Sequence, residues 1–161
     1  MIELQHIPDA IRQRLIGLKA MRINKGESGA SVFKFLQPTA AALFLKCQAG
    51  PERSDLNDEI ARLSYLNGLP VPSSRLVAFG ETSETVAMLT EAVPGSDLTA
   101  SCGLPPDKVV KIAADALRHL HSLDPSHCPF DHSAARRIEA ARERVTLGLV
   151  DPDDFDEDHL G

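Results

Sequence analysis

The feature that most constrains the fold is a change from strand-like to helix-like sequence patterns at Pro94 and Gly95. On the N-terminal side, short apolar runs alternate with turn residues, a pattern typical of β-strands. These runs cover 31–36, 41–47, 75–79 and 85–89. On the C-terminal side, apolar residues recur at helical spacing over 107–123 and 134–147. Strands segregated from helices in this way predict an α+β fold whose two lobes are joined at the Pro-Gly connector.

Two helices are expected within the strand-rich half, over 7–18 and 54–67. In the second of these, one face carries Leu56, Ile60, Leu63 and Leu66. Ser54 is placed to cap this helix and Gly68 to end it. The runs 31–36 and 41–47, with Pro38 and Thr39 between them, predict a β-hairpin.

The charge balance excludes one class of function. The chain has 17 basic and 23 acidic residues, a formal net charge of −6. A protein that binds the phosphate backbone of nucleic acids needs a basic face, so no nucleic-acid partner is expected. Six of the acids lie within the last eleven residues, namely Asp151, Asp153, Asp154, Asp156, Glu157 and Asp158.

The length predicts a single domain, and the cysteine content predicts reduced thiols rather than disulfides. A length of 161 residues matches one domain, and the three cysteines are far apart with no C-x-x-C spacing. Glu3, His6 and Asp9 interrupt the N-terminus where a signal peptide needs an apolar run. No run approaches the roughly 20 apolar residues of a membrane span. We therefore expect a soluble, cytoplasmic protein with no membrane partner.

The segment 26–31, with the sequence Gly-Glu-Ser-Gly-Ala-Ser, precedes a strand. Small residues let backbone N–H groups approach phosphate oxygens, and the hydroxyls of Ser28 and Ser31 add donors. The same composition also suits an ordinary tight turn, which is the commoner structure. The segment alone therefore leaves both interpretations open.

Lys46 and Glu59 are the other two residues with candidate chemistry. Lys46 ends the apolar run Leu43-Phe44-Leu45-Lys46, where burial of an ammonium is costly unless an anion meets it. Glu59 precedes Ile60 on the expected helix, close to its apolar stripe. Alternatively, the lysine extends to water from a strand edge and the glutamate is solvated.

The order of these features, rather than any one of them, matches the small lobe of protein kinases. Within that fold the chain resembles the bacterial aminoglycoside 3′-phosphotransferases, the kanamycin and neomycin kinases. The resemblance runs from about Gly26 onward. The segments that carry it are 59–66, 93–98, 120–125, 127–132 and 148–151. It implies a protein-kinase-like fold: an antiparallel β small lobe followed by the first helices of a helical large lobe.

The resemblance implies a nucleotide site in the small lobe. Ser28 would donate to the β-phosphate, and Lys46, held by Glu59, would bind the α- and β-phosphates. Met88 would lie behind the adenine, whose edge would bond the backbone of Thr90 and Ala92. The full set of expected cofactor-binding residues is Gly26, Ser28, Gly29, Ser31, Lys46, Glu59, Met88, Thr90 and Ala92.

The acidic segment would face the substrate. Aminoglycosides are polycations, so Asp154, Asp156 and Glu157 would attract and orient their ammonium groups. A solvated acidic terminus is the alternative, and most such runs are solvated.

The family's catalytic loop is His-Gly-Asp with a later Asn, followed by an Asp that holds Mg²⁺. This sequence has no His-x-Asp and no asparagine after Asn67. We therefore expect no catalytic residue and no metal ligand in this chain, and no turnover by it alone. The expected divisions are a nucleotide-binding lobe over 1–91, a hinge over 92–98, and over 99–161 the start of a helical lobe that stops before the catalytic loop.

The resemblance implies ATP-dependent phosphorylation of the 3′-hydroxyl of an aminoglycoside, with Mg²⁺, as an antibiotic-resistance activity. Two alternatives stay open: a related small-molecule kinase with another acceptor, and a non-catalytic nucleotide-binding or interaction module. Helices left without the rest of a large lobe would expose apolar faces, so self-association is also expected.

Overall fold

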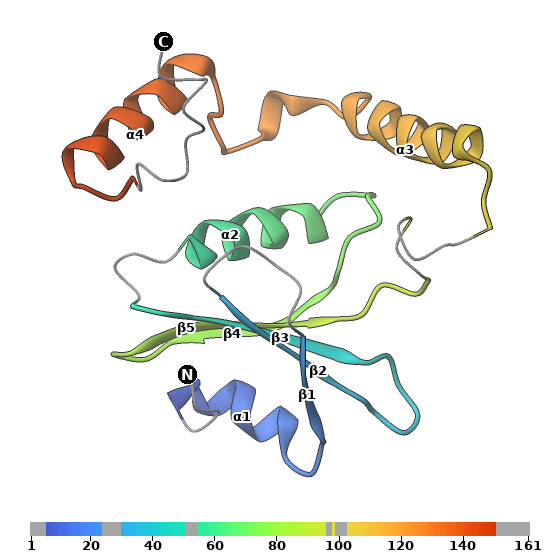
Figure 1. Cartoon of the computed structure of the whole chain (residues 1–161), viewed down its shortest axis with the longest axis vertical. Coiled ribbons are helices and arrows are strands. Elements are labelled where there is room, and N and C mark those ends of the chain that lie inside the picture. The colour runs from blue at the N-terminus through green and yellow to red at the C-terminus, as the bar shows by residue number, and fades with distance from the viewer. Residues whose placement is uncertain (1–5, 24–29, 51–54, 96–97, 99–102, 151–161) are drawn as a thin grey trace. The chain divides into compact units, whose positions relative to one another are not determined.

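The computed structural model describes residues 6–23, 30–50, 55–95, 98 and 103–150 (Figure 1). The chain divides into two compact units, Met1–His121 and Ser122–Gly161. The sequence-based division at 92–98 stays a prediction. Gly26, Ser28, Gly29, Ser54, Asp154, Asp156 and Glu157 lie outside the described residues.

The first unit contains one five-stranded sheet in which every pairing is antiparallel. Its strands are β1 (Ala20–Ile23), β2 (Ser31–Phe35), β3 (Leu43–Ala49), β4 (Leu76–Glu81) and β5 (Thr85–Glu91). Their order across the sheet is β1-β2-β3-β5-β4. The predicted hairpin of β2 and β3 is confirmed, and β3 and β5 lie inside the sheet with a partner on each side.

Alternation along β3 gives the sheet two different faces. Leu43, Leu45 and Cys47 are buried, whereas Phe44 and Lys46 between them are half-buried. Successive residues of a strand point to opposite faces, so the odd-numbered residues of β3 build the core.

Helix α1 (Asp9–Leu15) covers the odd-numbered face of β3. Ile11 and Leu15 pack there in one buried cluster with Leu45 and Leu89, which are 0% exposed. Figure 1 shows α1 and α2 on opposite sides of the sheet.

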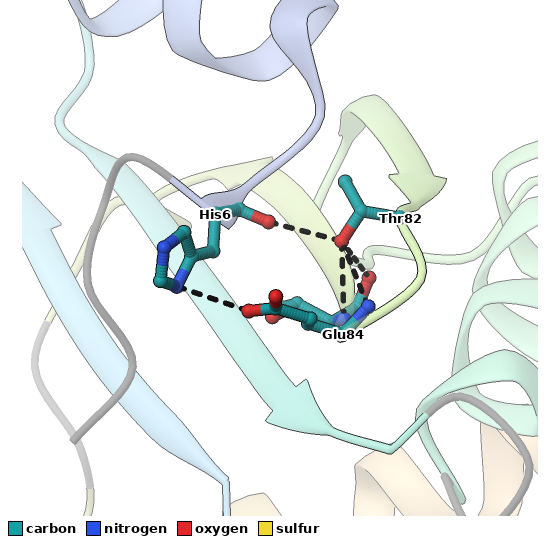
Figure 2. A network of polar contacts seen from close by, with 4 residues as sticks. His6, Thr82 and Glu84 are labelled. Carbon is teal, nitrogen blue, oxygen red and sulfur yellow. Dashed lines mark hydrogen bonds and ion pairs between the residues drawn. The ribbon is translucent and has the colours of Figure 1, made fainter.

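A small polar network fastens the segment before α1 to the turn between β4 and β5 (Figure 2). The hydroxyl of Thr82 donates to the carbonyl of His6 at 3.1 Å, and it accepts from the N–H of Thr85 at 3.1 Å. His6 Nδ1 lies 3.2 Å from Glu84 Oε2. These contacts hold the start of α1 against the sheet edge.

Helix α2 (Leu56–Asn67) packs on the other face of the sheet. Leu56 and Ile60 form a second buried cluster with Val86 and Met88. As expected from the sequence, the helix ends at Gly68, whose N–H donates to a carbonyl of the last turn.

The helices beyond the connector are α3 (Pro106–His121) and α4 (Ala134–Thr146), with a short 3₁₀ turn at Pro125–His127. Gly148 ends α4 with a φ of 64°, as expected of a glycine after a helix. Neither helix contains a buried residue. Their exposed apolar side chains are Val110, Ile112, Leu117, Leu120, Ile138 and Val145. Among the described residues, no helix is both long and apolar enough to cross a membrane.

Candidate functional site

An ion pair joins the centre of the sheet to α2. Lys46 Nζ lies 2.6 Å from Glu59 Oε2, as predicted. Leu56 and Ile60 fix the rotation of α2 against the sheet, which turns Glu59 towards β3. The side chain of Lys46 is 24% exposed and that of Glu59 is 44% exposed, so the pair lies at the rim of the core.

The alternative for Lys46, an ammonium at a strand edge, is therefore wrong. Its strand has β2 on one side and β5 on the other, and Lys46 itself faces Val32 and Met88 across the two ladders. A half-buried ammonium at this position needs an anionic partner, which Glu59 supplies. The geometry leaves the pair partly open to a second anion.

Sequence reasoning did not identify two further residues on the face of Lys46, the aromatic Phe44 and the cationic Lys34. Residues directly opposite one another in a ladder share a face, and the register places Lys34, Phe44 and Thr90 in one row. Lys34 Nζ lies 5.6 Å from the centre of the Phe44 ring, within the range of a cation–π contact. The period of two along β3 was the available signal, because Phe44 is two residues from Lys46.

An open pocket of about 520 Å³ lies between α2 and β5. This volume is within the usual range for sites that take a small molecule. Its lining residues are Asp55, Glu59, Arg62, Leu63, Leu66, Ser74, Met88 and Thr90. The structure thus brings together three of the expected site residues, Glu59, Met88 and Thr90, and it adds a wall of α2 residues that the sequence did not indicate.

Ser31 lies apart from this arrangement. It faces Cys47 across the β2–β3 ladder, so its side chain belongs to the face opposite Lys46, whereas Val32 shares the face of Lys46.

Burial raises the pKa of the Cys47 thiol to about 12, because the thiolate would lose its hydration. Cys47 is therefore part of the core and not a nucleophile.

Residues 90–92 form the connector segment that precedes Pro94 and Gly95, and its backbone is bonded on both sides. The N–H of Glu91 donates to the carbonyl of Arg75 at 2.9 Å, and the N–H of Ala92 donates to the carbonyl of Ala42 at 2.8 Å. Ala92, expected to donate to an adenine edge, thus has a partner within the sheet. A ligand that accepts from this N–H must share or replace the bond to Ala42.

The side chains of Arg75 and Glu91 add a second link at the same place. Arg75 Nε donates to Glu91 Oε2 at 2.8 Å, and Arg75 Nη2 donates to Glu91 Oε1, which makes the pair bidentate. These hydrogen bonds lower the pKa of Glu91 and raise the pKa of Arg75. The sequence did not indicate this pair.

Comparison with known proteins places the chain among phosphotransferases. The model of the phosphotransferase enzyme family matches residues 19–160. The chain belongs to this family. An aminoglycoside 3′-phosphotransferase of Escherichia coli is 36% identical over 152 residues, which cover 91% of this chain and 55% of that protein. A streptomycin 3″-kinase of Streptomyces griseus is 31% identical over 156 residues, covering 91% of this chain and 53% of that protein.

The fold of this family member agrees with a solved relative. The crystal structure of an aminoglycoside 3′-phosphotransferase of type VIII superposes with a TM-score of 0.73 at 34% identity, covering 94% of this chain and 56% of that one. The expected kinase-like fold and the resemblance to aminoglycoside phosphotransferases are thereby confirmed. The chain spans about half the length of the curated relatives it matches.

Proposed function

We propose that this chain provides the nucleotide-binding part of an aminoglycoside phosphotransferase that uses ATP. The observation that carries the proposal is the ion pair of Lys46 and Glu59 at 2.6 Å, in a chain of the phosphotransferase family. Protein kinases use a strand lysine paired with a helix glutamate to hold the phosphates of ATP. The same pair here joins an inner strand to the helix packed on it.

Lys46 donates to oxygens of the α- and β-phosphates, while Glu59 keeps its ammonium in place. Phosphoryl transfer needs positioning and charge stabilisation more than covalent help from the protein, and this pair supplies both. The segment 26–31 adds backbone donors around the phosphates, and the hydroxyl of Ser28 faces the β-phosphate. Gly26 and Gly29 let the backbone come close to them.

The pocket beside β5 takes the adenine. Met88 and Thr90 line it, and Met88 lies on the same face as Lys46, which it faces across the β3–β5 ladder. Base and phosphates therefore meet one continuous face of the sheet. The backbone of Thr90 and Ala92 reads the adenine edge, and the Ala42 carbonyl competes for the N–H of Ala92.

The acceptor is the 3′-hydroxyl of an aminoglycoside, supported by the name of the Escherichia coli relative. Asp154, Asp156 and Glu157 bind its ammonium groups. The Streptomyces griseus relative is named for another position, the 3″-hydroxyl of streptomycin, so phosphorylation at a different hydroxyl is a second candidate.

Mg²⁺ accompanies ATP in phosphoryl transfer. Within the described ranges, no three His, Cys, Asp or Glu side chains form a group that could hold a metal ion. The residues of this chain bind and orient the nucleotide.

Calorimetric titration with ADP and with inorganic tripolyphosphate tests the proposal. Replacing Lys46 by Met removes a charge-assisted hydrogen bond, worth about 1.5–3 kcal/mol, so both affinities should fall about ten- to hundredfold. Lys108→Met removes the same charge from an exposed position of α3 and should change neither. Equal affinities for the wild type and Lys46→Met, or a wild type that binds neither ligand, would contradict the nucleotide site.

A further inference from the structure

Arg75 binds Glu91, the last residue of β5, through both its backbone and its side chain. Its carbonyl accepts from the N–H of Glu91, and its guanidinium forms the bidentate pair with the carboxylate of the same residue. A single residue thus holds both the backbone and the side chain of Glu91. The two residues that flank Glu91, Thr90 and Ala92, are those whose backbone is proposed to read the adenine.

The ladder between β4 and β5 is irregular next to the contact of Arg75 with Glu91. Leu76 pairs with Thr90, but the register shifts between Leu76 and Ala78, which pairs with Leu89. A bulge of this kind disrupts a ladder locally and increases its twist. On the side of β4, the strand pairing therefore holds the end of β5 less firmly than β3 does on the other side, where the pairing runs without a break to Glu91. The contacts of Arg75 reinforce this β4 side.

The geometry of the pair suits this task. A guanidinium that meets a carboxylate through two parallel hydrogen bonds fixes orientation as well as distance, which a single ammonium cannot do. The side chain of Arg75 is 64% exposed and that of Glu91 is 32% exposed, so little of the core depends on them. The ion pair therefore fixes the backbone of residues 90–92 rather than stabilising the core.

We propose that Arg75 is a positioning residue for the adenine base, acting through Glu91 to fix the backbone of residues 90–92. The inference rests on the proposed nucleotide site. Arg75 does not touch the nucleotide. It sets the position of the groups that do, while the phosphates depend on Lys46 of the neighbouring strand β3.

Titration with two ligands separates the base from the phosphates. Arg75→Ala should weaken binding of ADP about three- to tenfold and leave the affinity for inorganic tripolyphosphate unchanged. Arg75→Lys keeps the charge but not the bidentate geometry, so its affinity for ADP should lie between those of the wild type and Arg75→Ala. Lys111→Ala is the matched control, because it removes one cation from the exposed pair with Asp115 on α3. It should change neither affinity.

Amide hydrogen exchange gives a readout that needs no ligand. Arg75→Ala leaves the carbonyl of residue 75 in place, so faster exchange at Glu91 and Ala92 reports the loss of the side-chain contacts alone. Exchange at Leu45 in β3 should not change. The expected result is a local increase of at least about threefold in the exchange rate at the connector.

Four outcomes would overturn the inference. Unchanged affinity for ADP, or unchanged exchange at Glu91 and Ala92, would show that Arg75 does not position the connector. An equal loss of ADP and tripolyphosphate binding with a lower melting temperature would show a merely structural role. A wild type that binds neither ligand would remove the proposed function first and this inference with it, whereas a wild type that binds both, with Arg75→Ala indistinguishable from it, removes the inference alone.

Discussion

Raising the pH from 8 to 10 should destabilise the chain through the thiol of Cys47. Burial raises its pKa from an ordinary 9.0 to about 12 in the folded state. Above pH 9 the unfolded chain releases this proton while the folded chain keeps it, so the stability that is complete below pH 9 falls as the pH approaches 12. At pH 10 nearly all of the unfolded thiol is ionised and almost none of the folded thiol. The difference amounts to about 1–2 kcal/mol.

Urea unfolding, followed by circular dichroism in the presence of a reductant, measures the effect at both pH values. Wild type should lose about 1–2 kcal/mol more than Cys47→Ala between pH 8 and 10. Cys128→Ala should behave like the wild type, because Cys128 is exposed. Comparing changes with pH removes the cost of the substitution itself. If Cys47→Ala lost as much stability as the wild type over this range, burial of the thiol would not be the cause.

Two further predictions concern the core and the acidic segment. Ile11→Ala should lower the free energy of unfolding by about 2–5 kcal/mol, because Ile11 is 0% exposed beneath the sheet, while Ile16→Ala at a 76% exposed position should cost less than about 0.5 kcal/mol. Replacing Asp154, Asp156 and Glu157 by their amides should weaken kanamycin binding about 3- to 100-fold at low salt, less at high salt, and leave ADP binding unchanged in titration calorimetry. Equal kanamycin affinities at low salt would reject the substrate role of this segment.

The sequence predicted those parts of the site that follow from local periodicity. Leu56 and Ile60 mark the buried stripe of a helix, and Glu59 lies beside that stripe. Lys46 ends an apolar run, and in the strand the residues of this run alternate between buried and half-buried positions. Because both patterns are local, they place the two charges on facing surfaces as soon as the helix packs on the sheet.

The features that the sequence did not reveal depend on how distant strands are arranged. Arg75 and Glu91 meet because β4 pairs with β5 in a register that a bulge alters, and no local pattern encodes a bulge. The order β3-β5-β4 is equally non-local, as is the bond from Ala92 to Ala42. Phe44 differs from these, because strand alternation alone put it on the face of Lys46.

The alternation of β3 also places the residues that stabilise the fold and those of the proposed nucleotide site on different faces of the sheet. Leu45 and Cys47 contribute to the cluster beneath α1, while Phe44 and Lys46 point to the face that α2 only partly covers. Substitutions at odd positions should therefore change the free energy of unfolding before they change nucleotide affinity, and substitutions at even positions should do the reverse. Neighbouring residues of one strand can serve such different ends because the strand is an inner one. Its backbone is fixed by β2 and β5 on either side, whatever side chains its two faces carry.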